Sequence, residues 1–237
     1  MRVEFLGVGE AFDPEQPNSS ALVEHGGYTL LIDCGHSVIP RLWRARTDPD
    51  AIDAVYFTHH HADHVLGLPS VVNRWHYEGR RKELLVVTTP PGIEQIRQLI
   101  ALMRVEPPYP LRYAIAAETP NIGPYAVQLA PTQHAAPNYA IRLEADGKRL
   151  AWSGDGRPTP QSLALYAEAD MLLHECFEPE AAPDNLYHCD LPTARVIAGP
   201  RRIGLYHIRA GERCAMRLAI AGDARLFVPE AGDVVEV

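Results

Sequence analysis

Cysteines are few in this chain, and their spacing suits no structural role. Cys34, Cys176, Cys189 and Cys214 are widely separated and form no C-x-x-C pair. This spacing argues against a structural zinc knuckle and against a disulfide framework. We therefore expect reduced thiols.

Long apolar runs and an excess of positive charge are also missing. No stretch approaches the roughly 20 consecutive apolar residues of a membrane span, and residues 1–10 (MRVEFLGVGE) predict a first strand rather than a secretory segment. We expect a cytoplasmic protein with no membrane association. Acidic residues (30) outnumber Lys and Arg (22), which gives a net charge of −8. This balance argues against a strongly electrostatic nucleic-acid binder, because Lys and Arg supply most of the affinity for a phosphate backbone.

The 237-residue chain shows no internal repeat, low-complexity tract or credible linker. With 46% hydrophobic residues it can bury one large core, so we expect a single domain over residues 1–237. Apolar periodicity predicts strands at 2–7, 20–26, 28–33, 54–58, 83–89, 125–131, 139–144, 149–155, 170–175, 202–207 and 225–230. It predicts helices at 37–45, 68–79, 92–103, 159–169, 190–199 and 211–222, and the proline-rich segment 105–113 is expected to be a loop. Alternating strands and helices indicate an α/β fold.

Residues 58–67 (THHHADHVLG) place four histidines and one aspartate directly after an apolar strand-like run. His59, His61, Asp63 and His64 do not follow the i, i+4 spacing of a metal site on one helix face, so they require a sharply turning loop. Such a loop can direct side chains toward two centres. Imidazole and carboxylate suit zinc, iron(II) or manganese. The alternative is a polar loop that is rich in histidine without binding a metal.

The motif HHHADH matches H-x-H-x-D-H, the first signature of the metallo-β-lactamase superfamily. Later signatures follow in family order as His134 in PTQHAAPNY, Asp155 in WSGDG and His207 in GLYHI. The chain therefore resembles this superfamily over essentially its whole length. The resemblance implies an α/β fold of the four-layered αββα type, with two mixed β-sheets face to face and helices outside.

The resemblance also implies a binuclear metal site with seven protein ligands. One ion would be held by His59, His61 and His134, the second by Asp63, His64 and His207, and Asp155 would bridge them. We expect two divalent transition-metal ions, zinc first, with manganese or iron as alternatives. Two such cations can share a hydroxide, lower its pKa toward neutrality and clamp the attacking and departing oxygens. Asp33 would either orient a ligand histidine or cap a turn.

The C-terminal third resembles ribonuclease Z and its small phosphodiesterase relatives, including the cyclic phosphodiesterase of phosphonate breakdown. Residues 172–177 (LLHECF) are similar to that branch's H-E-A-T segment, and residues 187–199 (YHCDLPTARVIAG) to its later histidine and helix. The resemblance implies that His188 contacts the phosphate and helps the leaving oxygen depart, a role that suits an imidazole near neutral pH. Glu175 would either hold that ring or pack at a strand end, and His174 would be structural or border the site.

Three departures from the branch pattern bear on the substrate. Gly156 replaces the hydroxyl residue usual after the bridging aspartate, Cys176 interrupts the H-E-A-T pattern, and the spacing between His134 and Asp155 is short. The tRNA-processing enzymes typically carry a protruding arm between those two ligands, whereas this spacing leaves room only for a hairpin. We therefore do not expect tRNA to be the substrate.

These observations favour a binuclear phosphodiesterase that hydrolyses a small or cyclic phosphodiester with a metal-bridging hydroxide, which Asp63 would orient. The alternatives are a lactonase or other carbonyl hydrolase on the same metal site, tRNA processing of the ribonuclease Z type, and a non-catalytic metal-dependent binding protein. A homodimer is compatible with the sequence, which does not specify an oligomeric state.

Overall fold

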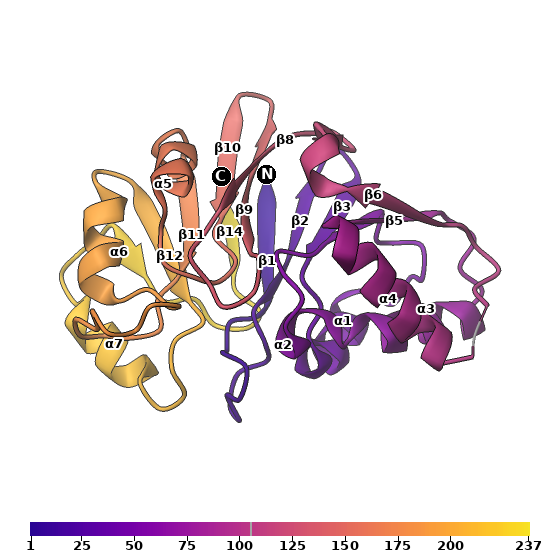
Figure 1. Cartoon of the computed structure of the whole chain (residues 1–237), viewed down its shortest axis with the longest axis horizontal. Coiled ribbons are helices and arrows are strands. Elements are labelled where there is room, and N and C mark those ends of the chain that lie inside the picture. Colours follow the sequence, from indigo (N-terminus) through magenta and orange to yellow (C-terminus); the bar gives the residue numbers. More distant parts are fainter. Residues whose placement is uncertain (105) are drawn as a thin grey trace.

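Two mixed, seven-stranded β-sheets form the centre of the structure, a computed structural model that describes residues 1–104 and 106–237. The first sheet has the order β14-β1-β2-β3-β4-β5-β6 and the second β13-β12-β11-β10-β9-β8-β7 (Figure 1). The first sheet contains β14 (Val234–Glu236), β1 (Arg2–Gly7), β2 (Ser20–His25), β3 (Tyr28–Ile32), β4 (Ala54–Tyr56), β5 (Leu84–Thr88) and β6 (Leu111–Ile115). The second contains β13 (Leu226–Phe227), β12 (Arg202–Tyr206), β11 (Met171–Glu175), β10 (Lys148–Trp152), β9 (Tyr139–Ala145), β8 (Tyr125–Pro131) and β7 (Asn121–Ile122).

Helices cover the outer face of each sheet (Figure 1). The first sheet is covered by α1 (Ile39–Ala45), α2 (Ala62–Val65), α3 (Leu68–Tyr77) and α4 (Pro90–Leu102). The second is covered by α5 (Pro160–Ala167), α6 (Leu191–Ala198) and α7 (Arg213–Ala219). Two short 3₁₀ helices, η1 (His36–Val38) and η2 (Ala116–Glu118), complete the helical elements.

Side-chain alternation along the strands explains the layers. In β3, Leu30 and Ile32 point into the core between the sheets, while Leu31 packs beneath the helices. In β11, Leu173 belongs to the core between the sheets and Leu172 to the core beneath α5 and α6. Each buried leucine contributes about 1.5–3 kcal/mol by leaving water. The αββα prediction is therefore confirmed.

The strands that precede the predicted ligands end at one edge of the sandwich. Strand β4 runs parallel to β3, and strands β10, β11 and β12 run parallel to one another, so their carboxyl ends meet. Asp33 follows β3, Asp155 follows β10 and His207 follows β12. Within each sheet, parallel pairing therefore brings residues that are far apart in the chain to the same edge.

One predicted loop is partly wrong. Residues 111–113 of the proline-rich segment belong to β6, an edge strand that pairs in parallel with β5. Leu111, Tyr113 and Ile115 alternate in a strand pattern that the preceding prolines obscured, because proline is tolerated just before an edge strand. Val105, which begins the predicted loop, lies outside the described residues. Within the described ranges, no helix is both long and apolar enough to cross a membrane.

Candidate metal centre

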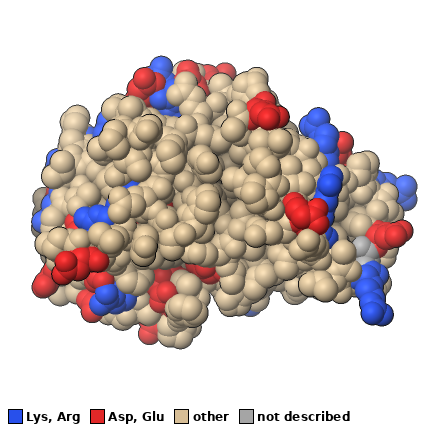
Figure 2. Space-filling model, viewed as in Figure 1, with Lys and Arg blue, Asp and Glu red and all other residues tan. Residues whose placement is uncertain are grey.

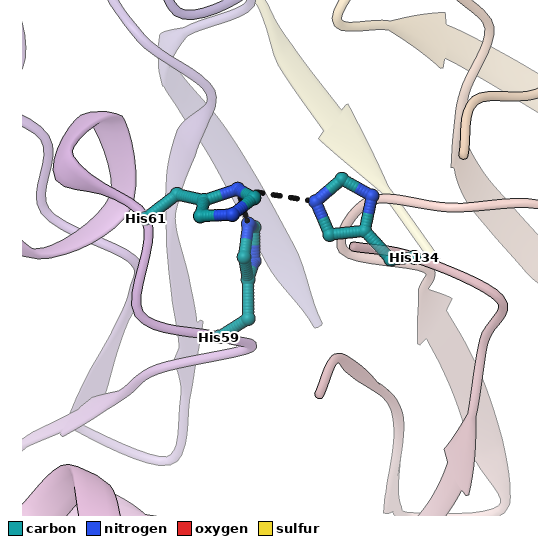
Figure 3. A group of neighbouring side chains, drawn as sticks. All are labelled: His59, His61 and His134. Atoms are coloured by element: carbon teal, nitrogen blue, oxygen red, sulfur yellow. Dashed lines mark hydrogen bonds between the residues drawn. The ribbon is translucent and has the colours of Figure 1, made fainter. Parts of the chain in front are cut away.

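Three of the predicted ligands form one tight group. The Nδ1 atom of His61 lies 3.0 Å from Nε2 of His59 and 3.1 Å from Nε2 of His134 (Figure 3). His59 and His61 come from the loop after β4, and His134 comes from the loop after β8. Three ring nitrogens that face one another at hydrogen-bond distance suit a shared cation better than a set of neutral imidazoles.

The other four predicted ligands, Asp63, His64, Asp155 and His207, form a second buried group. Nε2 of His64 lies 3.1 Å from Oδ2 of Asp63, and Nε2 of His207 lies 3.2 Å from Oδ2 of Asp155. The same Asp155 oxygen lies 3.5 Å from Nε2 of His64 and 3.8 Å from Nε2 of His59. Asp155 therefore lies between the two groups, where a bridging ligand is expected.

Local backbone structure holds the second group in place. Helix α2 begins directly after His61 and turns Asp63 and His64 toward the sheet edge. Gly35 allows this approach, because a Cβ at its position would lie 1.9 Å from the Asp63 carbonyl oxygen. His207 has a φ of 53° and donates its backbone N–H to the Val8 carbonyl. A positive φ in a residue other than glycine costs on the order of 1–3 kcal/mol, so the surrounding contacts must enforce it.

Asp33 orients the first loop from beneath. Its carboxylate accepts hydrogen bonds from Nδ1 of His64 (2.8 Å) and from the Thr58 backbone N–H (2.9 Å) and hydroxyl (2.8 Å). Because the Thr58 proton points to Asp33, the Thr58 oxygen is free to accept from Nδ1 of His59, 3.1 Å away. Both histidines therefore present Nε2 to the cluster, as carboxylate-oriented metal ligands do. Of the two roles considered for Asp33, the geometry supports orientation of a ligand histidine.

A backbone carbonyl orients His134 in a similar way. Nδ1 of His134 lies 2.9 Å from the Tyr187 carbonyl oxygen, so it donates there and leaves Nε2 for the cluster. The segment that carries His188 is thereby linked to a predicted metal ligand.

Unpartnered atoms show that the cluster suits a cation. In the described part of the chain, Nε2 of His64, Nε2 of His207 and Oδ1 of Asp155 are buried without a hydrogen-bond partner. A buried polar group without a partner costs about 1–3 kcal/mol, and a cation would remove that cost. Imidazole and carboxylate together match zinc, iron(II) and manganese. The residues therefore fit divalent metal ions.

The buried carboxylates of the cluster raise the pKa values of the neighbouring histidines. Burial disfavours the charged form of His207, but the nearby carboxylates of Asp155 and Asp63 outweigh it and raise the pKa of His207 to about 9. Burial likewise opposes the charged form of His64, yet Asp155, Asp33 and Asp63 together raise its pKa well above the ordinary value. A metal ion must displace these protons, so metal affinity falls as pH falls.

His188 lies next to the cluster on the side of the second sheet. Its ring stacks on Phe177 at 4.7 Å and on His207 at 5.4 Å between centroids, and its side chain is 22% exposed. Nδ1 of His188 lies 3.3 Å from Oε1 of Glu175. Burial works against the charged ring, but the adjacent Glu175 carboxylate outweighs it and raises the pKa of His188 above its ordinary value.

Glu175 is fully buried and joins two site segments. Its Oε1 atom accepts from the backbone N–H groups of Gly156 (2.8 Å) and Cys189 (3.0 Å). These residues directly follow Asp155 and His188 in the chain. The structure therefore places Glu175 where it can hold the His188 ring, which is one of the two roles considered for it.

Packing accounts for the unusual Gly156. Its φ is 104°, and a Cβ there would lie 2.6 Å from the Gln133 carbonyl oxygen and 2.7 Å from the Thr132 hydroxyl. A hydroxyl residue does not fit in this backbone arrangement. Cys176, the other altered residue, is buried in the core beneath α5 and α6.

Two other histidines, His60 of the HHHADH motif and His174, belong to neither ligand group. His60 points away from its neighbours and bonds Thr88 at 2.6 Å, and burial followed by the charge of His64 lowers its pKa to about 4. His174 is buried edge-on against Tyr166, so it is structural. Two further site features were not predicted from the sequence. One is Phe177, which the adjacent HEC motif could have indicated, and the other is the Tyr187 carbonyl, which leaves no side-chain signal.

A cleft of about 890 Å³ opens over the cluster. Its lining includes Glu10, Phe12, Asn18 and Tyr187 together with His188. Among the described residues, no lysine or arginine lines it. The segment between His134 and Asp155 is the β9–β10 hairpin with a tight turn at Asp146 and Gly147, so no arm extends from it.

Comparisons with known proteins agree with this architecture. The model of the family "Anti-Pycsar protein Apyc1" matches residues 1–192. The chain is 27% identical to ribonuclease Z of Haloarcula marismortui over 246 residues, which cover 98% of this chain and 74% of that protein. It is 45% identical to the anti-Pycsar protein Apyc1 of Bacillus phage 010DV004 over 92 residues, which cover 38% of this chain and 36% of that protein. The metallo-β-lactamase fold protein YhfI of Bacillus subtilis superimposes with a TM-score of 0.85 at 22% identity, covering 100% of this chain and 99% of that one.

Proposed function

We infer the function from one finding: the chain belongs to the family of the anti-Pycsar protein Apyc1. It is a hydrolase of the metallo-β-lactamase superfamily, in the ribonuclease Z-like branch. We propose that it is a binuclear metal-dependent phosphodiesterase that hydrolyses a small or cyclic phosphodiester. The observation that carries this proposal is the pairing of His188 with buried Glu175 beside the metal-capable cluster. A metal centre alone suits many hydrolyses, whereas a positioned proton donor suits the departure of a poor leaving group.

The donor set supports two ions, zinc first and manganese or iron(II) as alternatives. One ion would be held by His59, His61 and His134. The other would be held by Asp63, His64 and His207, and Asp155 would contact both. When bound, the ions supply Lewis-acid stabilisation of the phosphoryl oxygens and lower the pKa of a water molecule toward neutrality. Asp63 is well placed to orient the attacking water, because its carboxylate lies at the cleft and between His64 and His207.

His188 is the proposed general acid. Its ring is partly exposed in the cleft, and Glu175 favours its protonated form. The Nε2–H would donate a proton to the leaving oxygen as the P–O bond breaks. Phe177 stacks on one face of the ring and restricts its rotation. Glu175 fixes the other nitrogen, so the donor atom is held in one direction.

The cleft suits a substrate with one phosphodiester charge. Among the described residues it offers no lysine or arginine to neutralise additional phosphates. On the face shown in Figure 2, Lys and Arg are scattered and interspersed with acidic residues, without forming a broad basic patch. Together with the short hairpin between His134 and Asp155, this distribution supports a small substrate over tRNA.

A substrate panel tests the proposal. Zinc-loaded and chelated protein are assayed on bis(p-nitrophenyl) phosphate, on cyclic phosphodiesters and on a series of lactones. We expect metal-dependent hydrolysis of the phosphodiesters and little turnover of lactones. Hydrolysis of lactones alone would support the carbonyl hydrolase, and metal binding with no turnover across the panel would support a non-catalytic protein. Cleavage of a precursor tRNA 3′ trailer as efficient as that of small diesters would support ribonuclease Z activity.

A further inference from the structure

One arginine, Arg157, binds the backbone of the segment that carries His188. Its Nη1 atom donates to the carbonyl oxygens of Ala182 (3.1 Å), Asn185 (3.0 Å) and His188 (3.1 Å). These contacts enclose residues 182–188 within the reach of one guanidinium. A planar guanidinium can bind several carbonyls in a fixed arrangement, which a lysine ammonium on a flexible stem cannot reproduce.

The other guanidinium nitrogen is anchored by Asp190. Nη2 of Arg157 donates to Oδ2 of Asp190 at 2.9 Å, and Oδ1 of Asp190 caps α6 by accepting from the Thr193 N–H at 2.9 Å. Asp190 Oδ2 also accepts from the Ala182 N–H at 3.2 Å. Burial opposes ionisation of Asp190, but these hydrogen bonds outweigh it and lower its pKa to about 2. The anchor is therefore charged at neutral pH.

The backbone of Arg157 is joined to the His134 segment. Arg157 and Gln133 exchange two backbone hydrogen bonds of 2.9 Å, and Gln133 directly precedes His134. Arg157 also follows Asp155 by two residues. One residue thus connects three segments: those of the bridging aspartate, a predicted metal ligand and the candidate acid.

Besides Arg157, polar contacts from two neighbours and one internal turn hold this segment. Gln133 Nε2 donates to the Leu186 carbonyl (2.9 Å), His134 donates to the Tyr187 carbonyl (2.9 Å), and the Asn185 side chain accepts from the backbone N–H groups of Tyr187 and His188. Between Glu180 and Tyr187 the side chains are exposed or only half-buried, and no regular secondary structure is present. A segment with little buried apolar surface depends on polar contacts for its order. The guanidinium supplies three of those contacts directly.

We propose that Arg157 is a positioning residue for His188: it fixes the 182–188 segment so that the imidazole stays between Glu175 and the cleft. It does not touch the substrate, since it is absent from the residues that line the cleft in the described structure. The effect on turnover rests on the proposed function, while the effect on segment order does not. Misplacement of a catalytic group by about 1 Å can cost on the order of 10²-fold in rate.

The first experiment compares Arg157→Ala with Arg157→Lys and with a matched control, Arg80→Ala. Arg80 is also a guanidinium that donates to backbone carbonyls, those of Pro49, Ile52, Lys82 and Glu83. Three of these residues lie one or two positions before β4 or β5, so Arg80 lies at the amino ends of these strands, opposite the ligand loops. All proteins are assayed in saturating zinc. We expect Arg157→Ala to lower kcat about 10- to 100-fold on diesters with poor leaving groups, with KM nearly unchanged and a smaller loss on p-nitrophenyl esters. Arg157→Lys should recover only part of the rate, and added guanidinium ion should restore part of the rate of Arg157→Ala. Arg80→Ala should lower the melting temperature without changing the dependence on the leaving group.

A double variant separates positioning from general damage. If Arg157 acts through His188, then Arg157→Ala should cost little further activity in a His188→Ala background. Fully multiplicative losses would overturn the proposal, as would equal losses on good and poor leaving groups.

Hydrogen exchange tests the same idea without any substrate. We expect residues 182–189 to exchange faster in Arg157→Ala, while their exchange in Arg80→Ala matches the parent. Unchanged exchange in this segment would overturn the proposal even if phosphodiesterase activity is present. Faster exchange in a protein whose parent form hydrolyses no phosphodiester would support the ordering role and refute the proposed function instead.

Discussion

Replacement of His188 by alanine isolates the proposed proton donor from the metal centre. A ring nitrogen of His188 lies within 4.8 Å of donor atoms of His134 and Asp155, and the ring stacks on His207, but His188 is not one of the seven predicted ligands. The variant should therefore keep its metals, as measured by elemental analysis. Removing the ring also leaves Glu175 with two backbone donors, those of Gly156 and Cys189, so the buried carboxylate stays partly compensated.

The size of the effect follows from the role. A positioned acid contributes about 10²–10⁴-fold, which corresponds to roughly 2.7–5.4 kcal/mol of transition-state stabilisation. An alkoxide leaving group needs most of that protonation, whereas p-nitrophenolate needs little. We expect the full loss in kcat for alkyl diesters and a loss several-fold smaller for bis(p-nitrophenyl) phosphate.

The assay is a series of phosphodiesters with leaving groups of increasing pKa. His188→Ala should show a steeper decline of log kcat with leaving-group pKa than the parent. His36→Ala is the matched control, because His36 lines the same cleft but belongs to neither ligand group, and the described residues offer it no carboxylate partner. If His188→Ala retains its metals and follows the same slope as the parent and as His36→Ala, the general-acid role is refuted.

Four further outcomes follow from the structure. Glu175→Gln removes the charge that raises the pKa of His188, so this pKa should fall. Activity that needs protonated His188 is present below this pKa and lost above it, so in a pH–rate profile the loss should move to lower pH. A profile that does not shift would contradict this role of Glu175. Gly156→Ala should lower the free energy of unfolding by about 1–3 kcal/mol in denaturant titrations, because its φ of 104° and the Gln133 carbonyl exclude a Cβ; unchanged stability would refute that packing argument. Asp33→Ala should weaken zinc binding about 10- to 100-fold in a chelator competition, and equal affinity would show that it does not orient the ligands. Metal removal should lower the melting temperature as well as activity, since it leaves buried carboxylates uncompensated; a chelated protein with an unchanged melting temperature speaks against this.

Much of the fold was predictable because the strands are short, apolar and clearly bounded. Short continuous apolar runs in residues 28–33 and 170–175 predicted β3 and β11. Because β3 pairs in parallel with β4 and β11 with β12, the polar residues that follow lie together at the carboxyl ends within each sheet. The proline-rich segment was predicted to be a loop, although part of it forms strand β6. As an edge strand, β6 pairs only with β5, so nearby prolines do not prevent it from forming. β14 was also missed, since three residues carry too little periodicity.

For the site, side-chain motifs were informative and backbone contacts were not. The structure brings together all seven predicted ligands, and it places Glu175 beside His188. No pattern in the sequence indicates that the Tyr187 carbonyl orients His134, because any residue supplies a carbonyl. The role of Arg157 could not be predicted for the same reason, because its partners are mainly backbone atoms of a segment 25 to 31 residues away.

Zinc titration of the chelated protein tests the central claim most directly. Hydrolysis of bis(p-nitrophenyl) phosphate is followed as zinc is added in known equivalents, with bound metal measured in parallel. We predict that the activity rises with metal and levels off at two ions per chain, because the seven clustered ligands form two adjoining groups. Full activity in the metal-free protein, or no activity at any zinc ratio despite two bound ions, would contradict the assignment of a binuclear phosphodiesterase.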